Sequence, residues 1–121
     1  MVVDDEPEIT DIVATFLTES GYQVVIENDP AKAIDQIRTN KPDVVLLDIM
    51  MPGMDGYDVC RELKKDPKLA HTPVIFLTGK DRTDDNGRSF KVGGDMFIKK
   101  PFSCERLLEI VNIVVMSTSR H

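Results

Sequence analysis

Polar side chains follow four apolar runs in this sequence, at the point where each run ends: Asp4 and Asp5, then Asp48, Thr78 and Lys100. The run before Asp48 is the clearest, because residues 44–47 read VVLL. Such a run is typical of a strand buried on both faces of a sheet. A charge at its end is costly unless it faces water or is paired. The polar residues therefore predict a site formed by several strand ends.

The three acidic residues of this set predict a cation site. Two carboxylates about 4 Å apart repel each other by about 4 kcal/mol at an effective dielectric constant near 20. Three such groups must share protons, face water or bind a cation. A hard divalent ion that keeps several waters suits an all-oxygen set, which indicates Mg²⁺ or Mn²⁺. For Asp4 or Asp5 alone, a helix cap or turn residue is the competing explanation.

A lysine completes the set. The segment FIKKPF, residues 97–102, places two lysines after an apolar run. The ammonium of Lys100 could neutralise an acidic crevice and could also bind a phosphoryl oxygen. Strand alternation points Lys99 to the opposite side, so we expect Lys99 to be solvated.

The elements that must position these side chains alternate along the chain. Strands are predicted at 2–4, 24–26, 44–47, 74–77 and 96–98, and helices at 7–20, 30–40, 56–65, 83–93 and 104–115. The helix at 83–93 is the weakest, because it has few apolar anchors and an interior glycine. Five strand–helix units predict a (βα)₅ protein, with a parallel sheet covered by helices on both faces. Ligands of such sheets bind at the carboxyl ends of the strands, where the polar set lies.

Composition narrows the function classes. A chain of 121 residues is one domain by size, and its net charge of −6 with no basic stripe argues against nucleic acid as the direct ligand. No apolar run is long enough for a transmembrane helix, and the acidic start does not resemble a signal peptide. Cys60 and Cys104 lack the spacing of a zinc site or a disulfide framework. We therefore expect a cytoplasmic domain with reduced thiols and no membrane partner.

Four ordered motifs carry a family resemblance: VVDDE, VVLLDIMMPGMDG, PVIFLTGKD and FIKKPF. The chain resembles a response-regulator receiver domain of two-component signalling, with the chemotaxis-regulator-like fold. The resemblance covers essentially the whole chain. It implies a single receiver domain at 1–121, a doubly wound, flavodoxin-like sheet of order 2-1-3-4-5, and a tail at 117–121. Only Met1 precedes VVDDE, so we expect a clipped first strand, either excised from a longer protein or abbreviated.

The resemblance also implies a role for each motif residue. Asp48 would accept a phosphoryl group from the phosphohistidine of a sensor histidine kinase or phosphotransfer protein, so the domain would be a phosphoacceptor rather than an enzyme. Mg²⁺, or Mn²⁺, would be held by Asp5, Asp48 and the main-chain oxygen of Met50, with Asp4 acting through water. Thr78 and Lys100 would bind phosphoryl oxygens. Phe97 would be the switch aromatic, whose rotamer changes together with the position of Thr78. Met50 and Lys80 would border the path of hydrolytic water, and we expect slow autodephosphorylation because Met50 cannot orient water.

The resemblance further implies that helix four, strand five and helix five would read out the phosphorylated state. In the last helix, Ile113 and Met116 fall outside the core-facing arc. These residues are either scattered surface positions or part of a patch for a homodimer or an output partner.

Three other functions compete with this interpretation. A haloacid-dehalogenase-like phosphatase also uses a strand-end aspartate, but it needs a second Asp where this chain has Met50. An FMN carrier needs a phosphate loop after the first strand, where DDEPE would repel phosphate. A degenerate receiver acting only as a binding module is disfavoured by the intact polar set. His71 and His121 are expected to be solvent histidines.

Overall fold

The computed structural model describes residues 1–49, 51, 53, 55–78, 96–99 and 102–118. Several predictions fall outside the described residues: those for Met50, Lys80, Lys100 and His121, and the weak helix at 83–93.

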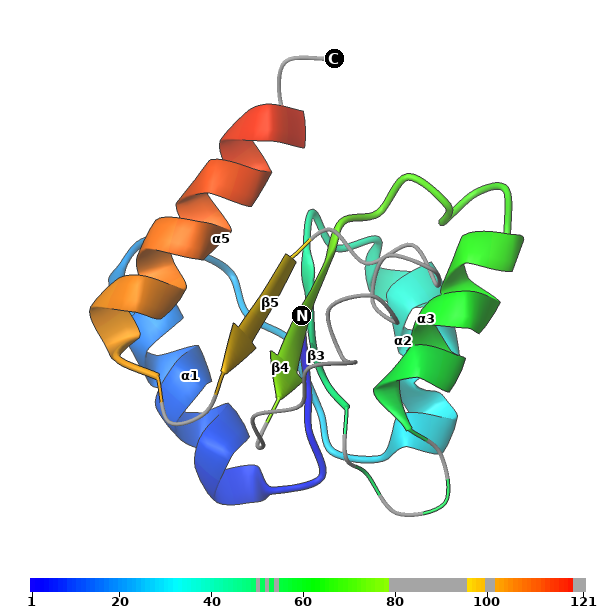
Figure 1. The fold of residues 1–121 in the computed structure, drawn as a ribbon, viewed down its shortest axis with the longest axis horizontal. Helices are drawn as coiled ribbons and strands as arrows, with labels where there is room; N and C mark the ends of the chain where they lie inside the picture. Colours follow the sequence, from blue (N-terminus) through cyan, green and yellow to red (C-terminus); the bar gives the residue numbers. More distant parts are fainter. Residues whose placement is uncertain (50, 52, 54, 79–95, 100–101, 119–121) are drawn as a thin grey trace.

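Five parallel strands form one sheet in the order β2-β1-β3-β4-β5, which confirms the predicted topology. Strands β3, β4 and β5 lie side by side in Figure 1. The strands are β1 (Val2–Val3), β2 (Ile26–Glu27), β3 (Val45–Asp48), β4 (Val74–Thr78) and β5 (Met96–Lys99). Val2 pairs with Leu46 of β3, and Asp48 pairs with Leu77 of β4. Because every strand runs in the same direction, all carboxyl ends lie along one edge of the sheet.

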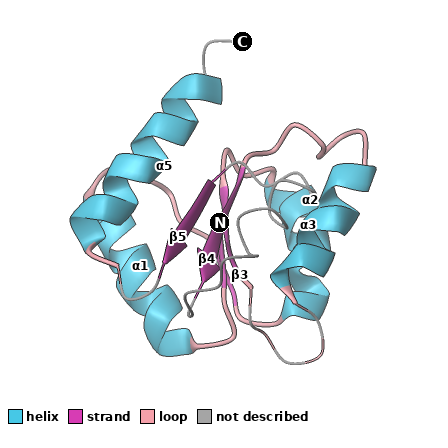
Figure 2. Ribbon diagram, viewed as in Figure 1, coloured by secondary structure: helices cyan, strands magenta, loops and turns pink. Residues whose placement is uncertain are grey.

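Helices cover both faces of this sheet (Figure 2). Helices α1 (Pro7–Glu19) and α5 (Cys104–Thr118) lie on one side, and α2 (Ala33–Asn40) and α3 (Gly56–Lys65) lie on the other. Two of these helices are capped by the residue that precedes them: the Asp55 carboxylate accepts a hydrogen bond from the Asp58 N–H (2.9 Å), and the Ser103 hydroxyl accepts one from the Arg106 N–H (3.1 Å). None of the described helices has the length and apolar character needed to span a bilayer.

The second strand and second helix differ from the prediction. β2 occupies Ile26–Glu27 rather than 24–26, because β1 has only two residues with which it can pair. The predicted helix at 30–40 begins as a 3₁₀ turn, η1 (Pro30–Lys32), and becomes α-helical at Ala33. Asp29 caps this turn by accepting a hydrogen bond from the Ala31 N–H (2.9 Å), which favours the tighter start.

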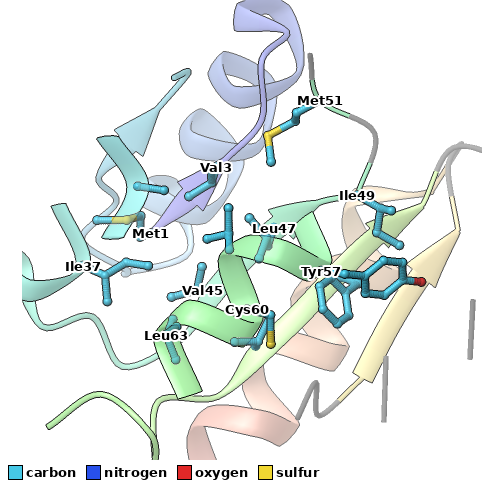
Figure 3. Packing of buried hydrophobic residues seen from close by; sticks show 14 of the residues in the cluster. Met1, Val3, Ile37, Val45, Leu47, Ile49, Met51, Tyr57, Cys60 and Leu63 are labelled. Carbon is cyan, nitrogen blue, oxygen red and sulfur yellow. The ribbon is translucent and has the colours of Figure 1, made fainter. Parts of the chain in front are cut away.

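Strand alternation divides the core into two clusters, one on each face of the sheet. Val3, Leu47 and Phe76 belong to the cluster under α2 and α3, whereas Val2, Leu46 and Leu77 belong to the cluster under α1 and α5. Figure 3 shows part of the first cluster, including Tyr57 on α3. The ring centroids of Tyr57 and Phe76 lie 4.9 Å apart. The strands that carry the polar set are therefore held rigidly from both sides.

Candidate functional site

Four acidic side chains meet at the carboxyl edge of the sheet. Asp4, Asp5, Glu6 and Asp48 each offer a carboxylate oxygen, and these oxygens all lie within 4.8 Å of one another. Asp4 is 0% exposed and Asp48 is 2% exposed, whereas Asp5 is half-buried and Glu6 is exposed. The structure thus brings together the three acids singled out in the sequence and adds Glu6. The cluster combines buried negative charge with an opening to solvent.

The backbone around Asp48 is tightly defined. Asp48 is the last residue of β3, and pairing continues one residue further because the Ile49 N–H donates to the Leu77 carbonyl (3.1 Å). The Gly56 N–H then donates back to the Ile49 carbonyl (2.9 Å). A Cβ atom on Gly56 would lie 2.3 Å from the main-chain oxygen of Asp48. Helix α3 therefore begins in direct contact with the backbone of Asp48, and only glycine permits this approach.

Asp4 is held through three of its own groups. Its N–H donates to the Glu27 carbonyl (3.2 Å), which links it to β2. One of its carboxylate oxygens accepts a hydrogen bond from the Glu6 N–H (3.0 Å). Its main-chain oxygen accepts a hydrogen bond from the side-chain amide of Asn28 (2.8 Å). The acidic pair after β1 therefore sits on a hydrogen-bonded turn rather than a free loop.

The remaining predicted residues lie around this cluster or outside the described part. Thr78 ends β4 and pairs across the sheet with Lys99, which is exposed as expected. Phe97 is half-buried and packs against the cluster that contains Phe76. Among the histidines, His71 is exposed, in agreement with a solvent histidine.

The acidic cluster has the donor chemistry of a divalent cation site. Its four side chains offer only carboxylate oxygens, which are the ligands of hard cations such as Mg²⁺. Carboxylates this close repel one another, and two of them are buried. A bound cation would therefore offset the free energy of this repulsion and burial. The residues present therefore fit Mg²⁺.

A sizeable hollow lies away from these acids. Its volume is about 920 Å³, and it is lined mainly by residues of segments 41–43 and 66–73, which precede β3 and β4. It therefore lies at the amino edge of the sheet, opposite the carboxylates. The acidic cluster does not contribute to it, so this hollow is not where the predicted chemistry would occur.

The family model of the response regulator receiver domain matches residues 1–112. The chain belongs to the response-regulator receiver family. It is therefore a receiver domain of the kind found in two-component response regulators. Family membership sets aside the haloacid-dehalogenase-like phosphatase and the FMN carrier.

Solved receiver domains have the same fold. The signal receiver domain of a signal transduction histidine kinase from Syntrophus aciditrophicus is 34% identical, with a TM-score of 0.90 and coverage of 99% of this chain and 91% of that chain. The receiver domain of Francisella response regulator 1452 is 35% identical, with a TM-score of 0.88 and coverage of 97% and 95%. The beryllofluoride-activated receiver domain of RstA from Klebsiella pneumoniae is 32% identical, with a TM-score of 0.87 and coverage of 94% and 95%.

Three residues near the receiver site were not singled out from the sequence. Glu6 follows the acidic pair directly, so its inclusion in VVDDE was the available signal. Asn28 follows β2 as the acids follow their strands, but the strand was predicted to end at residue 26, two residues before it. Gly56 resembled an ordinary helix start, and only the folded structure reveals its contact with Asp48.

Proposed function

We propose that this receiver domain accepts a phosphoryl group on Asp48 from a phosphohistidine and thereby switches the face formed by helix four, β5 and α5. The observation that supports the proposal most directly is the cluster of four carboxylates, with oxygens within 4.8 Å of one another, that includes the strand-end Asp48. In a receiver-family chain, these carboxylates would combine the acceptor Asp48 with ligands for a divalent cation.

In the proposed reaction, a carboxylate oxygen of Asp48 attacks the phosphorus of the donor. A P–O bond forms, the P–N bond to the donor imidazole breaks, and the imidazole leaves with the electron pair and takes up a proton. A carboxylate is a weak nucleophile, and it approaches a negatively charged group. Catalysis then depends on cancelling charge on the phosphoryl oxygens and on alignment of the attacking oxygen. The burial of Asp48 in a rigid strand end serves the alignment.

The other residues take the roles that the family resemblance implied. Bound Mg²⁺ would supply positive charge beside the phosphoryl oxygens, and Asp5, Asp48 and the main-chain oxygen of Met50 would hold it, with Asp4 acting through water. Lys100 would neutralise a further phosphoryl oxygen, and the Thr78 hydroxyl would hydrogen-bond to another. The side chain of Phe97 would change its rotamer when Thr78 binds the phosphoryl group, and this change would reach the surface.

We propose that dephosphorylation is slow, so that the domain is a long-lived acceptor and not a phosphatase. Hydrolysis requires a water molecule in line with the P–O bond. By the family resemblance, Met50 and Lys80 would border that path, and a thioether such as that of Met50 is a poor partner for orienting water.

The proposed partner is a sensor histidine kinase or a phosphotransfer protein, and no nucleic acid is needed at this surface. The receiver domain of the Syntrophus protein belongs to a signal transduction histidine kinase, and that of the Francisella protein belongs to a response regulator. We treat residues 1–121 as a single domain, and we propose that it belongs to a protein of one of these two kinds. The exchange with a kinase implies a cytoplasmic location.

Beryllofluoride, a mimic of the phosphoryl group, tests the acceptor function on the unmodified chain. With Mg²⁺ present, we expect its addition to shift the backbone amide resonances around Asp48 and Thr78, and we expect EDTA to reverse the shifts. The matched control is beryllofluoride without a divalent cation. Unchanged spectra in the presence of Mg²⁺ would contradict the proposal and favour a receiver that acts only as a binding module.

The α5 surface supports a second proposal about partners, namely a homodimer favoured by phosphorylation. Ile113 is 49% exposed and Met116 is 59% exposed, so the two residues do face outward as expected. With beryllofluoride and Mg²⁺, we expect sedimentation to detect a dimer that the Ile113→Lys variant does not form. Ile12→Lys is the matched control, because Ile12 is also 59% exposed but lies on α1. If the unmodified chain stays monomeric, or if both variants lose the dimer, this face is not the interface.

A further inference from the structure

One side-chain amide connects three elements beneath the acidic cluster. Asn28, directly after β2, donates to the main-chain oxygen of Asp4 (2.8 Å) and to the hydroxyl of Thr10 (3.0 Å). The Thr10 hydroxyl in turn donates to the Pro7 carbonyl (3.0 Å). Asp4 and Thr10 are both 0% exposed. The ends of β1 and β2 and the first turn of α1 are therefore joined through a single amide group.

The direction of each hydrogen bond is set by the chemistry of the groups. A main-chain carbonyl can only accept, so the atom of Asn28 beside Asp4 must be the NH₂ group. That group has two hydrogens, and it has one acceptor for each. The Thr10 hydroxyl accepts a hydrogen bond from Asn28 and donates its only hydrogen to the Pro7 carbonyl. The network is thus satisfied along its length without adding charge beside four acids.

The network restrains the peptide that carries the proposed metal ligand Asp5. The carbonyl of Asp4 and the N–H of Asp5 belong to one planar peptide unit, so holding the carbonyl also sets the direction in which Asp5 leaves β1. The N–H of Asp4 is held separately by Glu27. Both peptide units that flank Asp4 are therefore attached to the end of β2. Residues that orient metal ligands in this way typically change metal affinity 10- to 100-fold when they are replaced.

We propose that Asn28, anchored by Thr10, is a positioning residue that presents Asp4 and Asp5 to the divalent cation required at Asp48. This inference rests on the proposed phosphoacceptor function and adds to it a residue that directly follows β2. Asn28 would not contact the cation itself; it acts through the main chain of Asp4. Loss of the amide leaves the four acids in the sequence but removes the support that sets their geometry.

Mg²⁺ affinity of the whole chain, measured by titration of backbone amide resonances, tests the inference. We expect Asn28→Ala to bind Mg²⁺ about 10- to 100-fold more weakly than the unmodified chain. We also expect faster hydrogen exchange at the Glu6 amide in metal-free protein, because that amide donates to the side chain of Asp4. The matched control is Asn40→Ala, which removes an amide bonded to the Gln36 carbonyl (2.8 Å) on the exposed end of α2. Asn40→Ala should leave Mg²⁺ affinity unchanged.

Variants of Thr10 make the test independent of the folding of Asn28→Ala. Thr10→Val removes the anchoring hydroxyl with little change in shape and should weaken Mg²⁺ binding, whereas Thr10→Ser keeps the hydroxyl and should restore it. Equal Mg²⁺ affinity in the unmodified chain, Asn28→Ala and Thr10→Val would overturn the inference and leave the phosphoacceptor proposal intact. If the unmodified chain itself fails to bind Mg²⁺, the phosphoacceptor proposal fails, and the positioning role fails with it.

Discussion

Replacing Asp48 with Asn is expected to abolish phosphorylation of this receiver domain by acetyl phosphate. The two side chains have nearly the same shape, but an amide oxygen cannot replace the carboxylate as nucleophile. Intact-mass measurement after incubation with acetyl phosphate and Mg²⁺ should detect a phosphorylated species for the unmodified chain and none for Asp48→Asn. A variant that still gains the phosphoryl group would place the acceptor elsewhere.

The same variant should respond less to Mg²⁺, since Asp48 contributes one of the clustered carboxylates. At a Mg²⁺ concentration 100 times its dissociation constant, a protein gains about 2.7 kcal/mol in unfolding free energy, and one that binds tenfold more weakly gains about 1.4 kcal/mol. Urea unfolding with and without Mg²⁺ measures this difference. An equal gain in both proteins would show that Asp48 is not part of the cation site.

Asp66→Asn is the matched control for the loss of one negative charge. Asp66 follows α3 at the opposite edge of the sheet, where the backbone N–H of Lys68 and the Arg38 guanidinium hold the pKa of its carboxyl below the usual range. Asp66 is therefore ionised at neutral pH, and its replacement changes the net charge as Asp48→Asn does. We expect this control to be phosphorylated normally, which would separate the role of Asp48 from a general effect of charge.

Much of the fold could be predicted because its signals are local. The run VVLL before Asp48 is apolar on both faces, and β3 is buried throughout. Asp55 and Ser103 precede helices and do cap them. The convergence of Asp4, Asp5 and Asp48 also followed from local signals, because parallel strands that end on the same edge bring their last residues together. Family membership was predictable from the order of the four motifs.

The parts that could not be predicted depend on contacts between distant segments. The position of β2 is set by pairing with the short β1, so the apolar residues Val24 and Val25 alone gave the wrong bounds. Asn28 was therefore not predicted as a site residue, because its role depends on the position of β2 and on a contact with the distant Asp4. The need for glycine at position 56 could not be predicted, because it arises where the start of α3 touches the backbone at the end of β3. In each case the decisive partner lies more than a few residues away in the sequence.

Because α3 touches the backbone of Asp48 at Gly56, we expect Gly56→Ala to damage both the fold and the proposed phosphoacceptor site. In an ordinary helix, replacing glycine with alanine stabilises by up to about 1 kcal/mol. Here the added Cβ would lie 2.3 Å from the main-chain oxygen of Asp48, so the backbone of α3 or of Asp48 would have to shift. Overpacking of this kind typically costs about 1–3 kcal/mol. The sign of the change in unfolding free energy, measured in urea, therefore distinguishes the two expectations.

Gly21→Ala provides the comparison that separates loss of stability from loss of the site. Gly21 has a φ of +100°, so alanine is strained there, but an added Cβ meets no atom within 4 Å. We expect Gly21→Ala to cost about 1–2 kcal/mol and still to bind beryllofluoride in the presence of Mg²⁺. Gly56→Ala should bind it more weakly even under conditions where both variants are fully folded, because α3 can relieve the clash only by displacing Asp48 or its own first turn. If Gly56→Ala is as stable as the unmodified chain, or if it binds beryllofluoride as well as Gly21→Ala does, the close approach of α3 to Asp48 does not govern the geometry of the phosphoacceptor.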